Sequence, residues 1–151
     1  MRYMFLLSII SVFTIQGCAT GQTTSKATDS RPCIANLSTE GSYWTSRTFR
    51  TFQDFSSVTR AAAFDQLVPD LASDGWTIAS SSKETGVITA WAKPNYAKGE
   101  TESLNVVIRD KGSAGIRVEL TYTAPAMAIV PESSLHQGFC KYLADVESAK
   151  M

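Results

Sequence analysis

The chain is poor in the side chains that most enzyme active sites and metal centres need. Its 151 residues include one histidine, His136, and three cysteines. No cluster of these residues has the spacing of a zinc site. The metalloprotease motif H-E-x-x-H, the nucleophile motif G-x-S-x-G and a glycine-rich phosphate loop are all absent from the sequence. We therefore expect a protein that is not an enzyme and that binds neither a metal nor another cofactor.

An excess of charge of either sign is also missing. The sequence has 14 Lys and Arg residues and 14 Asp and Glu residues, so the net charge is zero. A chain this close to neutral has no electrostatic attraction for nucleic acid, which we exclude as a partner. Internal repeats and a second long apolar run are also absent, and the length suits a single domain.

The first seventeen residues have the pattern of a secretory leader. Arg2 precedes an apolar run over residues 5–15, which is too short for a membrane span. The run ends in Ile15-Gln16-Gly17-Cys18, which resembles the lipobox of bacterial lipoproteins. The resemblance implies cleavage after Gly17, a diacylglyceryl thioether on Cys18 and an acylated new N-terminus. The alternative is an ordinary secretory leader with a cysteine near its cleavage site.

The segment after Cys18 is polar and has no large apolar residue. "ATGQTTSKATDSRP", residues 19–32, has the composition of a flexible linker. Because Ala19 rather than Asp follows the cysteine, the resemblance to lipoproteins implies the periplasmic face of the outer membrane. Several acyl chains hold a protein stably on a bilayer. We expect a leader over 1–17, a lipidated cysteine and tether over 18–32, and one domain over 33–151.

The other two cysteines, Cys33 and Cys140, lie near the two ends of that domain. In an oxidising compartment they are expected to form a disulfide. The alternative is a reactive thiol, which needs a base nearby. Only His136, four residues before Cys140 on the same predicted helix, could serve as that base.

Periodicity divides the domain into strands and helices. "YWTSRTFRTF", residues 43–52, is rich in aromatic and β-branched residues and predicts a strand. Apolar residues at helical spacing predict a helix that Ser56-Ser57 caps and Asp74-Gly75 ends. Pro69 is expected to kink this helix or to end its regular part near Val68.

Alternation of apolar and polar residues predicts the rest of the sheet. Four further strands are expected around residues 76–80, 87–92, 104–108 and 116–122, followed by a helix with an apolar stripe from Leu135 to Val146. The expected fold is α+β, an antiparallel sheet of about five strands with two helices on one face, in the order β-α-β-β-β-β-α.

The stretch "SDGWTIASSSKETGVITAW", with the alternating hairpin and closing helix after it, is similar to domains of small envelope lipoproteins of the BamC (NlpB) type. The likeness covers residues 43–148. It implies the fold and the cell-envelope setting only.

Three parts of the domain are candidates for a surface that binds a partner. The first is the open face of the sheet, where aromatic and arginine side chains would favour binding. The alternative is that Trp91 belongs to the core or caps this face. The second is the polar loop 93–102, and the third is "APAMAIVP", 124–131, whose composition favours packing over the end of the core and otherwise exposes apolar side chains. The candidate residues are Trp91, Val107, Arg109 and Arg117 on the sheet, Tyr96 in the loop, and Met127 and Ile129 in the third segment.

The expected function is that of a lipid-anchored, non-enzymatic module that binds another envelope protein, as an accessory of an assembly or secretion complex. An inhibitor of a hydrolase such as a lysozyme is the alternative. A third possibility is a hydrolase that uses His136 or the carboxylates Asp65, Asp70 and Asp74, although these residues fit the polar side of a helix.

Overall fold

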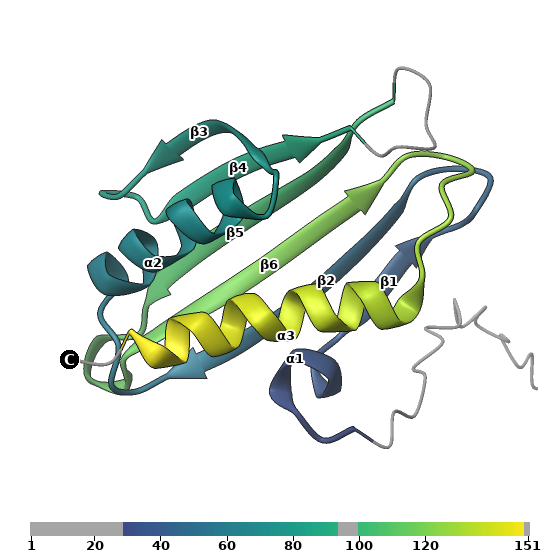
Figure 1. Cartoon of the computed structure of the whole chain (residues 1–151). Helices are drawn as coiled ribbons and strands as arrows, with labels where there is room; N and C mark the ends of the chain where they lie inside the picture. Colours follow the sequence, from purple (N-terminus) through teal and green to yellow (C-terminus); the bar gives the residue numbers. More distant parts are fainter. Residues whose placement is uncertain (1–28, 94–99, 150–151) are drawn as a thin grey trace, which may run out of the picture.

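The domain is built on one antiparallel sheet with its helices on one face. The computed structural model describes residues 29–93 and 100–149 (Figure 1). Six strands form the sheet in the order β1-β2-β6-β5-β4-β3. This confirms the α+β prediction, with six strands where about five were expected. The predicted leader and the lipobox with Cys18 lie outside the described residues, and so does the loop residue Tyr96.

The additional strand is β1, Ser38–Gly41, which pairs with β2, Arg47–Phe55. All four residues of β1 are exposed, so this strand has no apolar alternation that could reveal it. The prediction that a strand starts at residue 43 is wrong, because residues 42–46 form the turn between β1 and β2. In that turn the amide of Thr45 donates to the carbonyl of Ser42 at 3.2 Å. Aromatic content at 43 and 44 therefore marks a turn rather than a strand.

The first long helix is α2, Arg60–Ser73, and its ends differ in part from those predicted. Thr59 caps it, not Ser56-Ser57, because the Thr59 hydroxyl accepts from the amide of Ala62 at 3.2 Å. Pro69 lies inside the helix, which continues to Ser73 rather than ending at Val68. The proline removes only one intrahelical donor, and the packing of Leu67 and Leu71, both fully buried, holds the segment in place.

Four consecutive strands form the other side of the sheet. They are β3 (Thr77–Ser82), β4 (Val87–Ala92), β5 (Glu102–Asp110) and β6 (Ile116–Ala124). The register of β5 on β6 places Val106 opposite Leu120, and both are fully buried. As the alternation predicted, the face toward the helices carries the core side chains Ile88, Ala90, Leu104, Val106, Ile108, Ile116, Val118, Leu120 and Tyr122.

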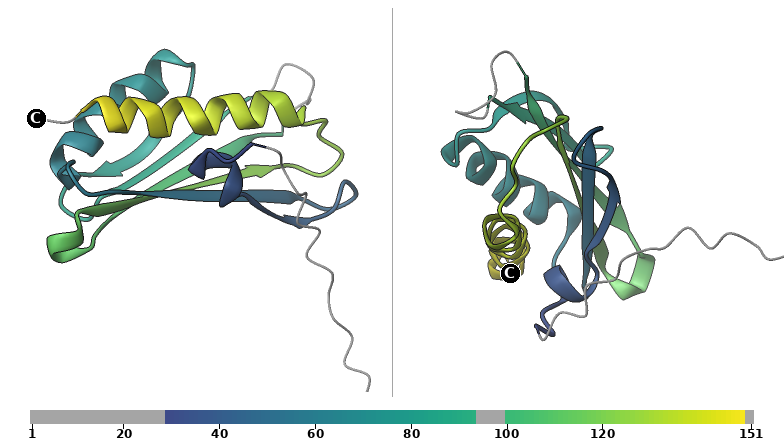
Figure 2. Two further views of the ribbon diagram at one scale, coloured as in Figure 1. Left: turned by 90° about the horizontal axis from the view of Figure 1, so that it is seen from below. Right: turned by 90° about the vertical axis from the view of Figure 1, so that its right-hand side faces the viewer.

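The last helix, α3 (Glu132–Ser148), crosses the same face as α2, and a short helix, α1 (Pro32–Ala35), lies beside it (Figure 2). The predicted disulfide is present: Cys33 of α1 is bonded to Cys140 of α3, with 5.2 Å between their Cα atoms. The buried hydroxyl of Thr51 donates to the carbonyl of Cys33 at 2.9 Å and fixes α1 on β2. Among the described residues, no helix is long and apolar enough to cross a membrane.

Candidate functional site

The open face of the sheet, which no helix covers, is polar over most of its area. Trp91 is half-buried on this face and stands between Thr77 of β3 and Ser103 of β5 in the register. Val107 lies four residue pairs further along, opposite Val87. The strand positions around them carry the small polar residues Thr48, Thr89, Asn105, Thr121 and Thr123. With Phe52 of β2, the apolar side chains of this face are one tryptophan, one phenylalanine and two valines, and polar residues separate the two aromatic side chains from the valines, so they form no broad apolar area.

The two arginines predicted on this face are already paired within the domain. Arg109 donates to Glu119 at 3.2 Å. Arg117 donates to both carboxylate oxygens of Asp54, at 2.7 and 2.9 Å, and its guanidinium lies 4.1 Å from the centre of the Phe52 ring. These bonds, together with a third from Lys111, hold the pKa of the Asp54 carboxyl well below its usual range. A partner that used either arginine would first have to compete with these carboxylates.

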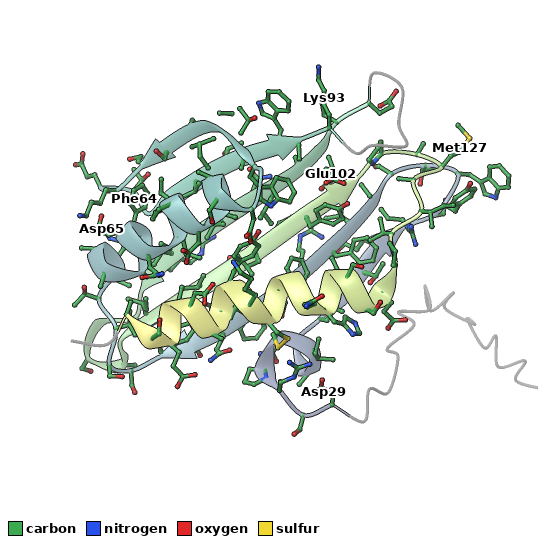
Figure 3. All side chains as sticks on the ribbon, viewed as in Figure 1. Asp29, Phe64, Asp65, Lys93, Glu102 and Met127 are labelled. Carbon is green, nitrogen blue, oxygen red and sulfur yellow. A yellow bond between two sulfur atoms is a disulfide. The ribbon has the colours of Figure 1, made fainter. Side chains whose placement is uncertain are left out.

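The most exposed apolar side chains lie together at one end of the sheet. We call Tyr43, Trp44, Met127 and Ile129 the apolar end cluster, and their exposed fractions are 43%, 78%, 61% and 70%. They come from the β1–β2 turn and from the segment between β6 and α3. The amide of Met127 donates to the carbonyl of Tyr43 at 2.7 Å, which ties the two segments together. Figure 3 shows Met127 at this end of the molecule, beyond the start of α3.

The segment 125–131 therefore both packs and exposes side chains. Ala128 is buried and Val130 packs against the core, as the composition favoured. The prediction that this segment packs over the end of the core is wrong for Met127 and Ile129, whose side chains are exposed. The backbone of Met127 has a positive φ of 61°, which residues other than glycine rarely adopt. This turn directs the Met127 side chain outward. Arg47 holds the turn by donating to the carbonyl of Ala128 at 2.9 Å.

A groove opens next to this cluster, between the first half of α3 and the sheet. It has a volume of about 460 Å³. The helix α2 covers the other end of the sheet, so the strand ends near Lys93 and Glu102 are left without a helix above them (Figures 1 and 3). The groove is lined by the side chains of Trp76, Leu104, Tyr122, Leu135, Phe139 and Tyr142, and also by Lys93, Glu102 and Ile129. Ile129 belongs to both the groove and the apolar end cluster.

Two hydrogen bonds fix the polar atoms of the groove. The indole Nε1 of Trp76 donates to the hydroxyl of Tyr142 at 3.0 Å. The hydroxyl of Tyr122 donates to Glu102 Oε2 at 2.6 Å. Burial raises the pKa of Tyr142 well above its usual value, and the neighbouring Asp74 carboxylate raises it further. Tyr142 therefore stays protonated at any physiological pH.

Sequence reasoning did not identify the groove, since its aromatic residues have the spacing of ordinary core positions. One signal was available in Gly138, a glycine within a 17-residue helix. Glycine in a helix interior costs about 1 kcal/mol relative to alanine, and it often has a packing or functional reason.

A reactive thiol would have needed a free cysteine and His136 as its base. Cys33 and Cys140 form the disulfide, so neither is a free thiol. His136 is half-buried, and its Nε2 lies 3.5 Å from Glu132 one turn earlier in α3 but makes no hydrogen bond with the described residues. Among the described residues no group of three metal-ligating side chains comes together.

The carboxylates of α2 have simple partners. Lys83 donates to Asp65 at 2.6 Å, Gln66 donates to Asp70 at 2.9 Å, and Lys141 of α3 donates to Asp74 at 2.8 Å. Asp65 and Asp70 lie on the polar side of the helix, as their spacing predicted, and Asp74 is the C-cap residue that follows it.

Comparisons with known proteins add no functional information. No family model and no curated protein matches the chain. A crystal structure of Ara h 8.0201 is similar over 69% of this chain and 94% of its own, with a TM-score of 0.45 and 13% identity. A DUF4468 family protein from Bacteroides ovatus is similar over 82% of this chain and 90% of its own, with a TM-score of 0.33 and 14% identity. These values are too low to support an argument about this chain.

Proposed function

We propose that this protein is a non-enzymatic, lipid-anchored module on the periplasmic face of the outer membrane, where it binds another envelope protein as an accessory of an assembly or secretion complex. The observation that carries the proposal is the apolar end cluster. The backbone hydrogen bond from Met127 to Tyr43 ties together the two segments that carry it, and its side chains are exposed rather than buried in the core. Exposed aromatic residues are the type that dominates binding hot spots.

The charge distribution favours this end of the domain over the open face of the sheet. The arginines of the open face already pair with Glu119 and Asp54, so binding there would require these bonds to break. Trp44, by contrast, is 78% exposed and contacts the Tyr43 ring edge-on, with 5.2 Å between ring centres. An aromatic pair of this kind loses little conformational entropy when a partner covers it.

The lipid anchor rests on the sequence Ile15-Gln16-Gly17-Cys18. A Cys18→Ala variant is expected to leave the membrane fraction, and the native N-terminal peptide is expected to carry the mass of a diacylglyceryl group and an acyl chain. Recovery of an unmodified Cys18 in a soluble native protein would contradict the anchor.

The partner can be captured with a photo-crosslinking amino acid placed at position 44 in intact cells. Position 84 is the matched control, because Glu84 is exposed in the β3–β4 turn at the opposite end of the sheet. We expect one stoichiometric envelope protein to crosslink from position 44 and not from position 84, and a Met127→Asp change to weaken the crosslink. Equal crosslinking from both positions would remove the end cluster from the proposal. Capture of an added lysozyme alone would replace the accessory role with that of an inhibitor.

A further inference from the structure

We propose that the groove between α3 and the sheet is a binding site for a small amphipathic molecule, with a flat apolar body and a cationic amine head group that pairs with Glu102. The proposal does not depend on the protein-binding function. The volume of about 460 Å³ lies within the range of about 300–1,000 Å³ that is typical of small-molecule pockets.

The aromatic walls are already in position for a flat apolar body. The rings of Trp76 and Tyr122 meet edge-to-face, with 6.2 Å between their centres and an angle of 84° between their planes. The bond from Trp76 to the Tyr142 hydroxyl fixes the indole against α3. Because the walls are held by these contacts, a ligand would not have to order them, which is the main cost of binding in a flexible site.

Glu102 determines the chemistry of the head group. The bond from Tyr122 orients its carboxylate through Oε2, and a carboxylate can accept several further hydrogen bonds. Within residues 29–93 and 100–149 no Lys, Arg or His nitrogen lies within 4.0 Å of this carboxylate. A ligand ammonium beside Glu102 would also lie near aromatic faces, which attract cations. Lys93 also lines the groove, but its ammonium lies more than 4.0 Å from this carboxylate, so an anionic head group placed beside Glu102 would meet repulsion from the carboxylate.

Gly138 borders the groove on the side of α3. A Cβ built at this position would meet no atom within 4 Å, so no neighbouring group requires a glycine there. The residue lines the groove, and a side chain at 138 would project into free space. A glycine that lowers helix stability without a steric reason, at a position that borders a cavity, is what a ligand site would require.

The test uses two probes with the same body and opposite head groups, 1-naphthylmethylamine and 1-naphthoate. Each is titrated by calorimetry into the full chain in a nonionic detergent, with a detergent-only titration subtracted. We expect the amine to bind saturably at one site per chain and the naphthoate to bind at least tenfold more weakly. Glu102→Gln is expected to remove most of this difference.

Gly138→Leu fills the groove, and it is expected to weaken binding of the amine at least tenfold. The control is Gln137→Leu, which places the same side chain on the exposed neighbouring position of α3 and is expected to leave binding unchanged. Thermal unfolding of both variants shows whether they are folded.

Any of the following results would overturn the proposal. The first is either no saturable binding of the amine or amine binding that the folded Gly138→Leu variant leaves unchanged. The second is binding of naphthoate as tight as that of the amine, which would remove Glu102 from the site. The third is capture of an envelope protein by a crosslinker at position 138 in cells, which would make a protein segment the occupant.

Discussion

The two ends of the sheet expose opposite kinds of side chain. Where β2 ends and β6 begins, the exposed residues are charged and paired: Asp54 binds Lys111 and Arg117, and Asp110 binds Arg60 at 3.2 Å. At the other end the exposed residues form the apolar end cluster, and the groove opens beside them. At the charged end the exposed side chains pair with one another, whereas at the apolar end none of the described residues covers the exposed apolar side chains.

The turns at the two ends show the same contrast. At the charged end, Gly115 occupies a positive φ of 89°, where a Cβ would collide with the carbonyl oxygen of Phe55. At the apolar end, the positive φ of 61° belongs to Met127. A glycine would adopt that conformation without strain. The chain has a methionine there with 61% of its surface exposed, and the proposed function gives this side chain a use outside the fold.

The largest expected effect lies at neither end. Changing Cys33 and Cys140 to serine removes the disulfide that closes a separation of 107 residues, and we expect the free energy of unfolding to fall by about 2–5 kcal/mol. Urea titration of both proteins measures the change. Cys18→Ser is the control and is expected to leave the free energy of unfolding unchanged. A change below about 1 kcal/mol in the double variant would mean that packing of α1 alone fixes the N-terminus of the domain.

The next effect is expected at the charged end. Asp54→Asn keeps the shape of the side chain but removes the carboxylate that Lys111 and Arg117 share. Because the Asp54 side chain is 40% exposed, solvent screens these pairs, and we expect the loss of unfolding free energy to stay below about 1 kcal/mol. Asp65→Asn, which loses a single exposed partner, is the matched control and is expected to change less. Equal losses in the two variants would show that sharing the carboxylate adds nothing.

The dependence of stability on pH follows from the same carboxylates. The pKa values of Asp54 and Asp74 are both lowered in the folded protein, by bonds from Arg117 and Lys111 in one case and from Lys141 in the other. Their contribution is complete above the unfolded pKa of about 3.9 and is lost as the pH falls through the lower folded values. We expect the free energy of unfolding to decrease as the pH is lowered below about 4. In Asp54→Asn this decrease should be smaller, and an unchanged slope would contradict the assignment.

The smallest effect on stability is expected at the apolar end. Trp44→Ala removes a side chain that is 78% exposed, so the free energy of unfolding should change by no more than about 0.5 kcal/mol. Leu120→Ala, a fully buried control, should cost about 2–5 kcal/mol. A loss of more than 1 kcal/mol for Trp44→Ala would show that the cluster supports the fold, and the contrast between the two ends would then disappear.

The sequence predicts those parts of the fold in which one face is buried and the other is not. The alternation over 104–108 and 116–122 gave the correct inward residues because a shift of one position would turn every one of them outward. Strand β1 could not be predicted, since the sequence STEG is polar on both faces. Tyr43 and Trp44 misled the prediction because strands and exposed binding turns favour the same aromatic residues.

The groove could not be read from the sequence for a different reason. Its residues, such as Leu104 and Phe139, have the same periodicity as the rest of the core. What makes a cavity there is that α2 ends before it reaches that end of the sheet, a fact of three-dimensional arrangement that no local pattern encodes. Gly138 was visible in the sequence, but it became informative only when the structure placed open space beside it.

The position of the disulfide also determines how the domain would respond to mechanical force. A pull on the chain before Pro32 reaches Cys33 first and passes through the disulfide into α3 at Cys140. Strand β1 begins at Ser38 at the edge of the sheet, and it lies beyond this link in the chain. When the chain is pulled between its two termini, the load therefore bypasses β1, and the segment between the two cysteines carries no tension.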